Sequence, residues 1–151
     1  MSAKNPIRIY VTHSFASHSD YHRVFEYLEA VPNFFYRNCS VPDHPPSMGG
    51  KEALKEEYRT QMKTAEVVIV LSSMYVENQF WTLYQMDAAQ AANLPLVAVE
   101  PFGVNVKVPP EVVTRSAEVV GWNERLIVDA IRRQGGHEET HRWDTIEFKL
   151  D

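Results

Sequence analysis

The pair Trp81 and Gln85 has the spacing that most clearly suggests a functional site in this sequence. Four residues apart in a helical pattern, the two side chains lie on one face of a helix, near its amino-terminal end. A structural pair would consist of a core tryptophan and a solvated glutamine. A functional pair would face a ligand together, and the spacing alone does not decide between these two interpretations.

Two further patterns suggest metal or nucleophilic chemistry. Residues 137–141 (HEETH) match the HExxH pattern, which sets two histidines on one helix face for zinc. This segment follows two glycines and has little apolar backing, so we expect no metal site there.

The single cysteine, Cys39, excludes an internal disulfide and needs a neighbouring base to act as a nucleophile. We expect it to be a small buried or loop residue.

The elements that must position these residues follow a regular order. The apolar run 67–71 predicts a strand buried on both faces, followed by a polar loop over 72–78 and a helix from about 79 to 93. An earlier strand over 7–12 ends in His13, Ser14 and Phe15 before an amphipathic helix to about residue 30. A weaker strand over 34–38 leads into a loop of prolines and glycines, of the length that often serves function.

Further strands over 96–100 and 119–120, with helices over 51–64 and 123–133, complete five β-α repeats. This order predicts an α/β fold, a flavodoxin-like doubly wound parallel five-stranded sheet with strand order 2-1-3-4-5. Ligands in such sheets bind outside the carboxyl ends of the strands, at the switch point. We therefore expect a site between residues 12–15 and 72–78. Phosphate-binding GxGxxG and GxxxxGK[ST] loops are absent from the sequence.

Length and composition favour one domain over residues 1–151, with a core over about 7–133 and a polar tail over 134–151. The net charge of −5, without a Lys/Arg cluster, argues against nucleic-acid binding. No apolar run approaches the roughly 20 residues that span a bilayer. The first residues lack the apolar core of a signal peptide, so we expect a cytoplasmic protein without membrane partners.

Five ordered segments carry a family resemblance: RIYVTHSF, FYRNCSVP, VVIVLSSMYVENQFW, VAVEPFG and VVGWN…IVDAIR. Together they cover about residues 7 to 133 and resemble a TIR (Toll/interleukin-1 receptor-like) domain. More closely, they resemble the bacterial TIR-like proteins typified by the TIR subunit of Thoeris anti-phage systems.

The resemblance implies an NAD+ glycohydrolase or ADP-ribosyl cyclase that uses NAD+ as substrate and needs no cofactor. The implied product is a cyclic, linear or conjugated ADP-ribose derivative that activates a separate effector. A phage protein as trigger and a homo-oligomer are further implied partners. A carboxylate near the ribose would stabilise the oxocarbenium-like transition state, and aromatic walls would stack on the base.

The resemblance places substrate contacts at Ser14, Phe15, Asn38, Ser40, Ser73, Tyr75 and Trp81. The family's catalytic glutamate lies four residues after the tryptophan, where this sequence has Gln85. Losing the charge should weaken transition-state stabilisation by several kcal/mol. Either the chain is an engineered inactive form, or it is a naturally silent TIR-like protein that acts as an interaction scaffold.

Overall fold

Strands and helices alternate along the chain in the computed structural model, which describes residues 2–136. The elements are β1 (Ile7–Val11), α1 (Ser19–Glu29), β2 (Tyr36–Asn38), α2 (Gly50–Met62), β3 (Val67–Leu71), α3 (Ser72–Glu77), α4 (Gln79–Ala91), β4 (Leu96–Val99), α5 (Pro110–Arg115), β5 (Glu118–Val120) and α6 (Glu124–Gln134). The HExxH match over 137–141, where we expect no metal site, and most of the predicted polar tail lie outside the described residues.

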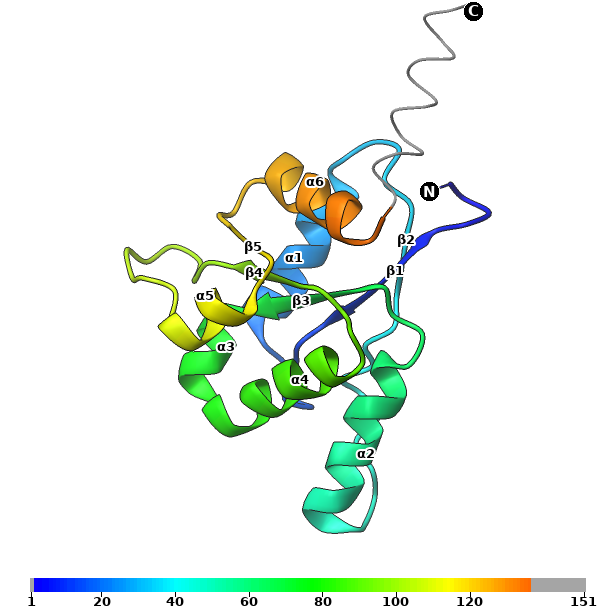
Figure 1. The fold of residues 1–151 in the computed structure, drawn as a ribbon, viewed down its shortest axis with the longest axis vertical. Coiled ribbons are helices and arrows are strands. Elements are labelled where there is room, and N and C mark those ends of the chain that lie inside the picture. The colour runs from blue at the N-terminus through cyan, green and yellow to red at the C-terminus, as the bar shows by residue number, and fades with distance from the viewer. Residues whose placement is uncertain (1, 137–151) are drawn as a thin grey trace, which may run out of the picture.

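The five strands form one parallel sheet in the order β2-β1-β3-β4-β5, as the sequence predicts (Figure 1). β1 and β3 occupy central positions, and every residue of β3 is buried. β2 and β5 form the edges and contain three residues each. All five strands point their carboxyl ends the same way, so the loops that follow them gather at one edge of the sheet.

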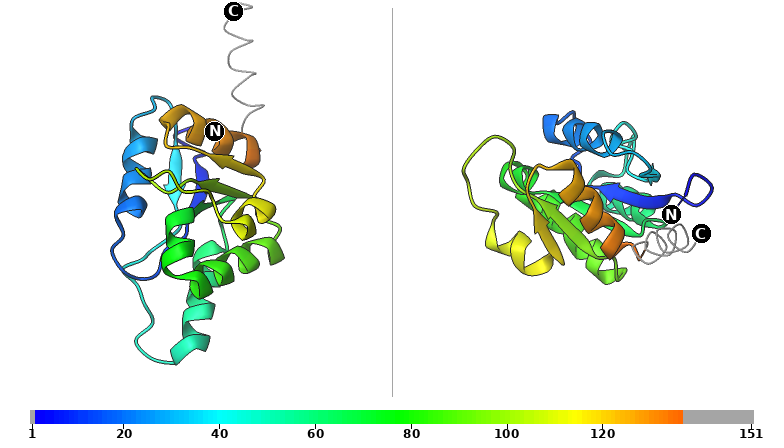
Figure 2. Two further views of the ribbon diagram at one scale, coloured as in Figure 1. Left: turned by 90° about the vertical axis from the view of Figure 1, so that its left-hand side faces the viewer. Right: turned by 90° about the horizontal axis from the view of Figure 1, so that it is seen from above.

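Two separate cores cover the two faces of the sheet, because side chains alternate along each strand. Ile9, Ile69 and Val97 belong to the core under α1 and α6. Tyr10 and Val68 belong to the core under α2 and α4. Figure 2 shows these helices on opposite sides of the sheet, with α5 on the side of α4. The side chain of Tyr10 therefore leads from β1 toward α4.

The loop predicted over residues 72–78 is instead the short helix α3, which runs directly from β3 and is followed by α4. Two of its polar side chains bond to the start of α1, Ser73 to Asp20 and the exposed Glu77 to His18, while Met74 and Tyr75 enter the cores. The connection after β4 likewise contains a helix, α5, which begins at Pro110. Proline suits the first turn of a helix because its missing N–H is not needed there.

The helices of residues 2–136 are all too short or too polar to cross a bilayer. The longest of them, α2 and α4, contain 13 residues each. In Figure 1, α2 and the long loop before it extend away from the sheet, beyond the carboxyl ends of the strands. That loop forms one wall of the pocket described next.

Candidate functional site

A pocket of about 530 Å³ opens at the carboxyl ends of β1 and β2. The loop after β1, the start of α1 and the long loop after β2 contribute its walls. It is lined by Phe15, Ala16, Ser17, Tyr21, His22, Asn38, Ser40, Val41, Pro42, Asp43 and Pro45. Three residues that the sequence placed in a site, Phe15, Asn38 and Ser40, thus meet in one pocket. It lies beside β2, however, and not between β1 and β3 where we expected it.

A ring of hydrogen bonds fixes the polar wall of this pocket. The Asn38 amide donates to the Tyr21 hydroxyl over 3.0 Å, and Ser40 Oγ donates to Asn38 Oδ1 over 2.5 Å. Because the only Ser40 hydroxyl proton goes to Asn38, the 2.8 Å bond between Tyr21 and Ser40 has Tyr21 as its donor. Within residues 2–136 no partner takes the second Nδ2–H of Asn38, a partly exposed residue that lines the pocket.

Phe15 holds its place in the pocket wall with a strained backbone. Its φ of 59° lies in the left-handed region, which costs an aromatic residue about 1–2 kcal/mol. Its N–H donates to His13 Nδ1 over 3.2 Å, and its ring meets the His13 ring edge-on at 4.7 Å. His13 therefore sets the position of the aromatic wall, and backbone strain of this kind is typical of functional loops.

His13 itself is buried and neutral. Its Nδ1 accepts from Phe15, so the ring proton lies on Nε2 and is donated to Gln61 Oε1 over 2.8 Å. Burial lowers the pKa of His13 to about 4, and the hydrogen bond with Gln61 offsets this only in part. The imidazole acts here as a fixed hydrogen-bonding group and carries no charge at neutral pH.

Gln85 is fully buried behind this loop and does not line the pocket. Its Oε1 accepts from the Tyr10 hydroxyl at 2.6 Å and from the His13 N–H at 3.0 Å. Its Nε2 donates to the carbonyls of His13 at 2.9 Å and Trp81 at 3.0 Å. Burial raises the pKa of Tyr10, which keeps that hydroxyl a donor.

The amide of Gln85 thus makes four hydrogen bonds, two through each end. The structural reading, a solvated glutamine, is wrong. A carboxylate in the same pose would keep the two donors at one oxygen and place its other oxygen against two carbonyl oxygens. The site as folded is therefore built around a neutral amide.

Trp81 and Tyr75 pack away from the pocket, on the side of α4. Trp81 is half-buried and its ring lies tilted against that of Tyr58, with 5.6 Å between ring centroids. Tyr75 is buried in the core beneath α4. Neither residue lines the pocket. The backbone carbonyl of Trp81 accepts a hydrogen bond from the Gln85 amide, behind the loop that forms the pocket wall.

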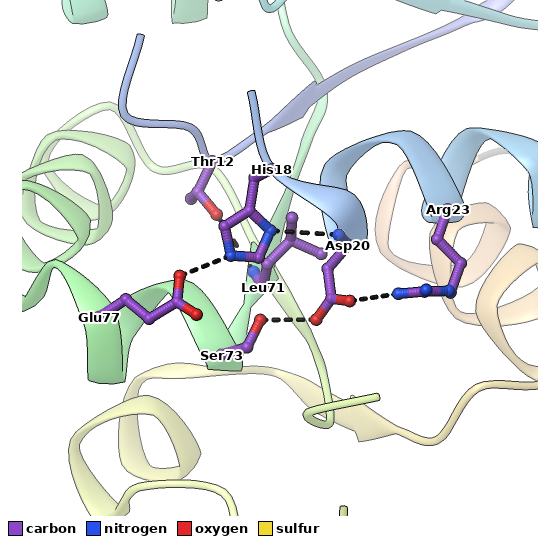
Figure 3. Close-up of polar contacts among 7 residues, drawn as sticks. All are labelled: Thr12, His18, Asp20, Arg23, Leu71, Ser73 and Glu77. Carbon is purple, nitrogen blue, oxygen red and sulfur yellow. Dashed lines mark hydrogen bonds and ion pairs between the residues drawn. The ribbon is translucent and has the colours of Figure 1, made fainter. Parts of the chain in front are cut away.

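Ser73 belongs to a second polar cluster, which joins α3 to α1 (Figure 3). Its hydroxyl donates to Asp20 over 2.6 Å, and the other oxygen of Asp20 pairs with Arg23 at 2.5 Å. His18 caps α1 by accepting from the Asp20 N–H and reaches Glu77 at 2.7 Å. These contacts cover the gap between β1 and β3, where we expected the site.

Replacing Ser73 by alanine is expected to lower the free energy of unfolding by about 1–2 kcal/mol, because the buried Asp20 carboxylate loses a donor. Urea denaturation measures the difference. Ser14→Ala is the matched control, since Ser14 is half-buried and bonds to no side chain within residues 2–136. Equal losses in the two variants would contradict the assigned role of Ser73.

Sequence patterns alone did not single out Tyr21 in the pocket wall, or Tyr10 and Gln61 in the hydrogen-bond network behind it. Tyr21 counted as part of an apolar stripe, and Gln61 is one polar residue of a charged helix. Their partners are far away in the chain, 75 residues for Tyr10 and Gln85. In the part of the chain described, residues 2–136, no three His, Cys, Asp or Glu side chains could hold a metal ion together.

Comparison with known proteins identifies the family. The family described as Thoeris protein ThsB, TIR-like domain, matches residues 10–105, from β1 to the loop after β4. No curated protein matches. Among solved structures, a conserved protein from Enterococcus faecalis V583 aligns with a TM-score of 0.61 and 9% identity, over 86% of this chain and 99% of that one. At that identity the likeness shows the fold alone. The matched range of the family model includes the pocket, His13, Gln61 and Gln85. The chain therefore belongs to the Thoeris ThsB TIR-like family.

Proposed function

We propose that this protein is the NAD+-processing TIR-like subunit of an anti-phage Thoeris system, in a form that binds the nucleotide but does not cleave it. The single observation that carries the proposal is the arrangement of an open pocket beside a fully satisfied Gln85 amide. The pocket offers aromatic and hydroxyl groups to a nucleotide, while the position that needs a carboxylate is locked in neutral form.

The pocket suits the nicotinamide riboside part of NAD+. Phe15 and Tyr21 supply aromatic surface for a planar ring, and the ring of Asn38, Tyr21 and Ser40 supplies hydrogen bonds for ribose hydroxyls. A volume of about 530 Å³ lies in the range of small-molecule sites.

In the cleavage reaction, the C1′–N bond breaks and its electron pair moves to nicotinamide, which leaves as a neutral molecule. The ribose is left as an oxocarbenium ion, which water or an internal nucleophile then captures with loss of a proton. A carboxylate stabilises this cation, whereas an amide does not. With Gln85 at that position, we expect binding of NAD+ or ADP-ribose and no measurable turnover.

Binding is tested by titrating NAD+ and ADP-ribose into the protein by calorimetry. Asn38→Ala is expected to weaken binding about tenfold, because the half-buried pocket wall loses its donor to the ligand and its bond to Tyr21. Asn105→Ala, in the loop after β4, is the matched control and should bind normally. If the unaltered protein binds neither compound at millimolar concentration, the assigned site is wrong.

The competing function is a silent interaction module. It is favoured by the same four bonds of Gln85 and by the exposed apolar side chains of Val76 and Phe80, which are 65% and 53% exposed. Such a module would assemble with a second copy of the chain or with a partner protein and bind no nucleotide. Sedimentation of the free protein, compared with the calorimetric titration, separates the two functions.

A further inference from the structure

Gln61 is a buried side chain of α2 that forms hydrogen bonds with the backbone of the long loop after β2. It is 7% exposed. Its Oε1 accepts from the Val41 N–H over 2.8 Å, and its Nε2 donates to the Val41 carbonyl over 3.1 Å. One side chain thus satisfies both backbone groups of a single loop residue, as a neighbouring strand would do.

The Gln61 amide has no freedom to turn within this arrangement. Its oxygen also accepts the Nε2–H of His13 at 2.8 Å, and its nitrogen also donates to Glu57 at 2.9 Å. All four hydrogen-bonding positions of the amide are therefore occupied. Rotating it by 180° would set donor against donor at His13 and acceptor against acceptor at Val41, so the orientation is fixed.

The rest of the loop lacks a comparable anchor. Between Pro42 and Gly49, no side-chain hydrogen bond ties the loop to another element of residues 2–136. The one backbone bond that begins there, from His44, returns to the Val41 carbonyl. Yet Pro42, Asp43 and Pro45 form the outer wall of the pocket. The position of that wall depends on the fixed point at Val41.

We propose that Gln61 is the positioning residue of the pocket. By fixing Val41, it holds the outer wall over the space that a ligand enters. Through His13 it also ties that wall to Phe15 on the opposite side, so one buried amide sets the distance between the two walls. The expected effect on ligand affinity rests on the proposed function. The expected effect of Gln61 on the order of the loop at Val41 is independent of the proposed function.

The two hydrogen bonds that Gln61 makes with the backbone of Val41 are called the clamp below. Hydrogen exchange of the ligand-free protein tests this clamp directly. In Gln61→Met, which keeps the length of the side chain but none of its bonds, the Val41 amide is expected to exchange at least about tenfold faster. Amides of β1 and β3 should keep their protection. Thr60→Met is the matched control, because it places the same residue on the exposed face of the same helix.

Gln61→Asn is the second variant, in case the methionine variant does not fold. It keeps the amide but is one methylene shorter, so it cannot reach Val41 and His13 together. Faster exchange at Val41 alone in either folded variant supports the clamp. Unchanged exchange at Val41, or an equal rise at every amide, overturns it.

Ligand affinity provides the second measurement. NAD+ and ADP-ribose are expected to bind about tenfold more weakly to the Gln61 variants than to Thr60→Met. If exchange at Val41 rises and affinity does not change, Gln61 fixes the loop without positioning the pocket, and the proposal fails. If the unaltered protein binds neither compound while Val41 exchange still rises, the proposed function fails and the clamp stands.

Discussion

Replacing Gln85 by glutamate is expected to make NAD+ cleavage measurable, at a rate about 100- to 1000-fold above the background seen with the unaltered protein. The gain follows from the proposed function, because the variant restores the charge that stabilises an oxocarbenium ion. It also requires the carboxylate to leave the pose of the amide, in which two carbonyl oxygens face its second oxygen, and to reach the pocket, which Gln85 does not line. Loss of NAD+ and release of nicotinamide, followed by chromatography, measure the effect.

The same substitution is expected to lower the free energy of unfolding by about 3 kcal/mol at pH 7. It buries a negative charge and sets one carboxylate oxygen against the carbonyl oxygens of His13 and Trp81, to which the amide of Gln85 donates. Burial raises the pKa of a carboxyl in the folded state above its unfolded value of about 4.3. The loss of stability should therefore be smallest below pH 4, grow as the pH rises toward the folded pKa, and stay constant above it.

Gln90→Glu is the matched control for both measurements, because Gln90 is an exposed residue of the same helix. It should neither cleave NAD+ nor lose stability with rising pH. An inert Gln85→Glu protein that folds and binds ADP-ribose would contradict a catalytic role for position 85.

The second large effect is expected from His13 on acidification. The folded-state pKa of about 4 lies below the ordinary value of 6.5, so the unfolded chain takes up the proton first. The contribution of this residue is complete above pH 6.5 and is lost as the pH falls toward 4. At about 1.4 kcal/mol per pH unit, the loss amounts to about 3 kcal/mol. Urea denaturation at a series of pH values measures it.

The matched variant is His13→Gln, which cannot take up a proton. Its stability at pH 7 falls because the bonds to Phe15 and Gln61 are altered, but the loss between pH 6.5 and 4 should shrink by about 3 kcal/mol. NMR of the imidazole gives an independent check, because His13 should remain neutral with its proton on Nε2 down to about pH 4. Equal pH dependence in the two proteins would contradict the burial of a neutral His13.

The sheet was predictable from the sequence because its signal is local. The run at β3 is apolar at every position, and the repeated order of strand and helix leaves few parallel topologies. The polar residues of α3 misled that reasoning, because side chains that bond to another helix produce the same pattern as a solvated loop.

The site was predictable only in part. Asn38 ends β2, Ser40 and Phe15 follow neighbouring strands, and all three meet in the pocket. Ser73 instead bonds to α1, and Tyr75 packs into the core. The burial of Gln85 depends on His13, which lies 72 residues earlier, and no helical periodicity records that contact. A buried amide is recognised only when all of its partners are in place.

The edge position of β2 has a consequence for any ligand of the pocket. One wall follows β1, an inner strand of the sheet, and the other follows a three-residue edge strand, where we expect local opening to need less free energy. A bound molecule bridges the two and must repay the entropy of holding the weaker one in place. For a ligand of this pocket, we expect affinity to depend on the order of the sheet edge as well as on the direct contacts, and binding to protect that edge against local opening.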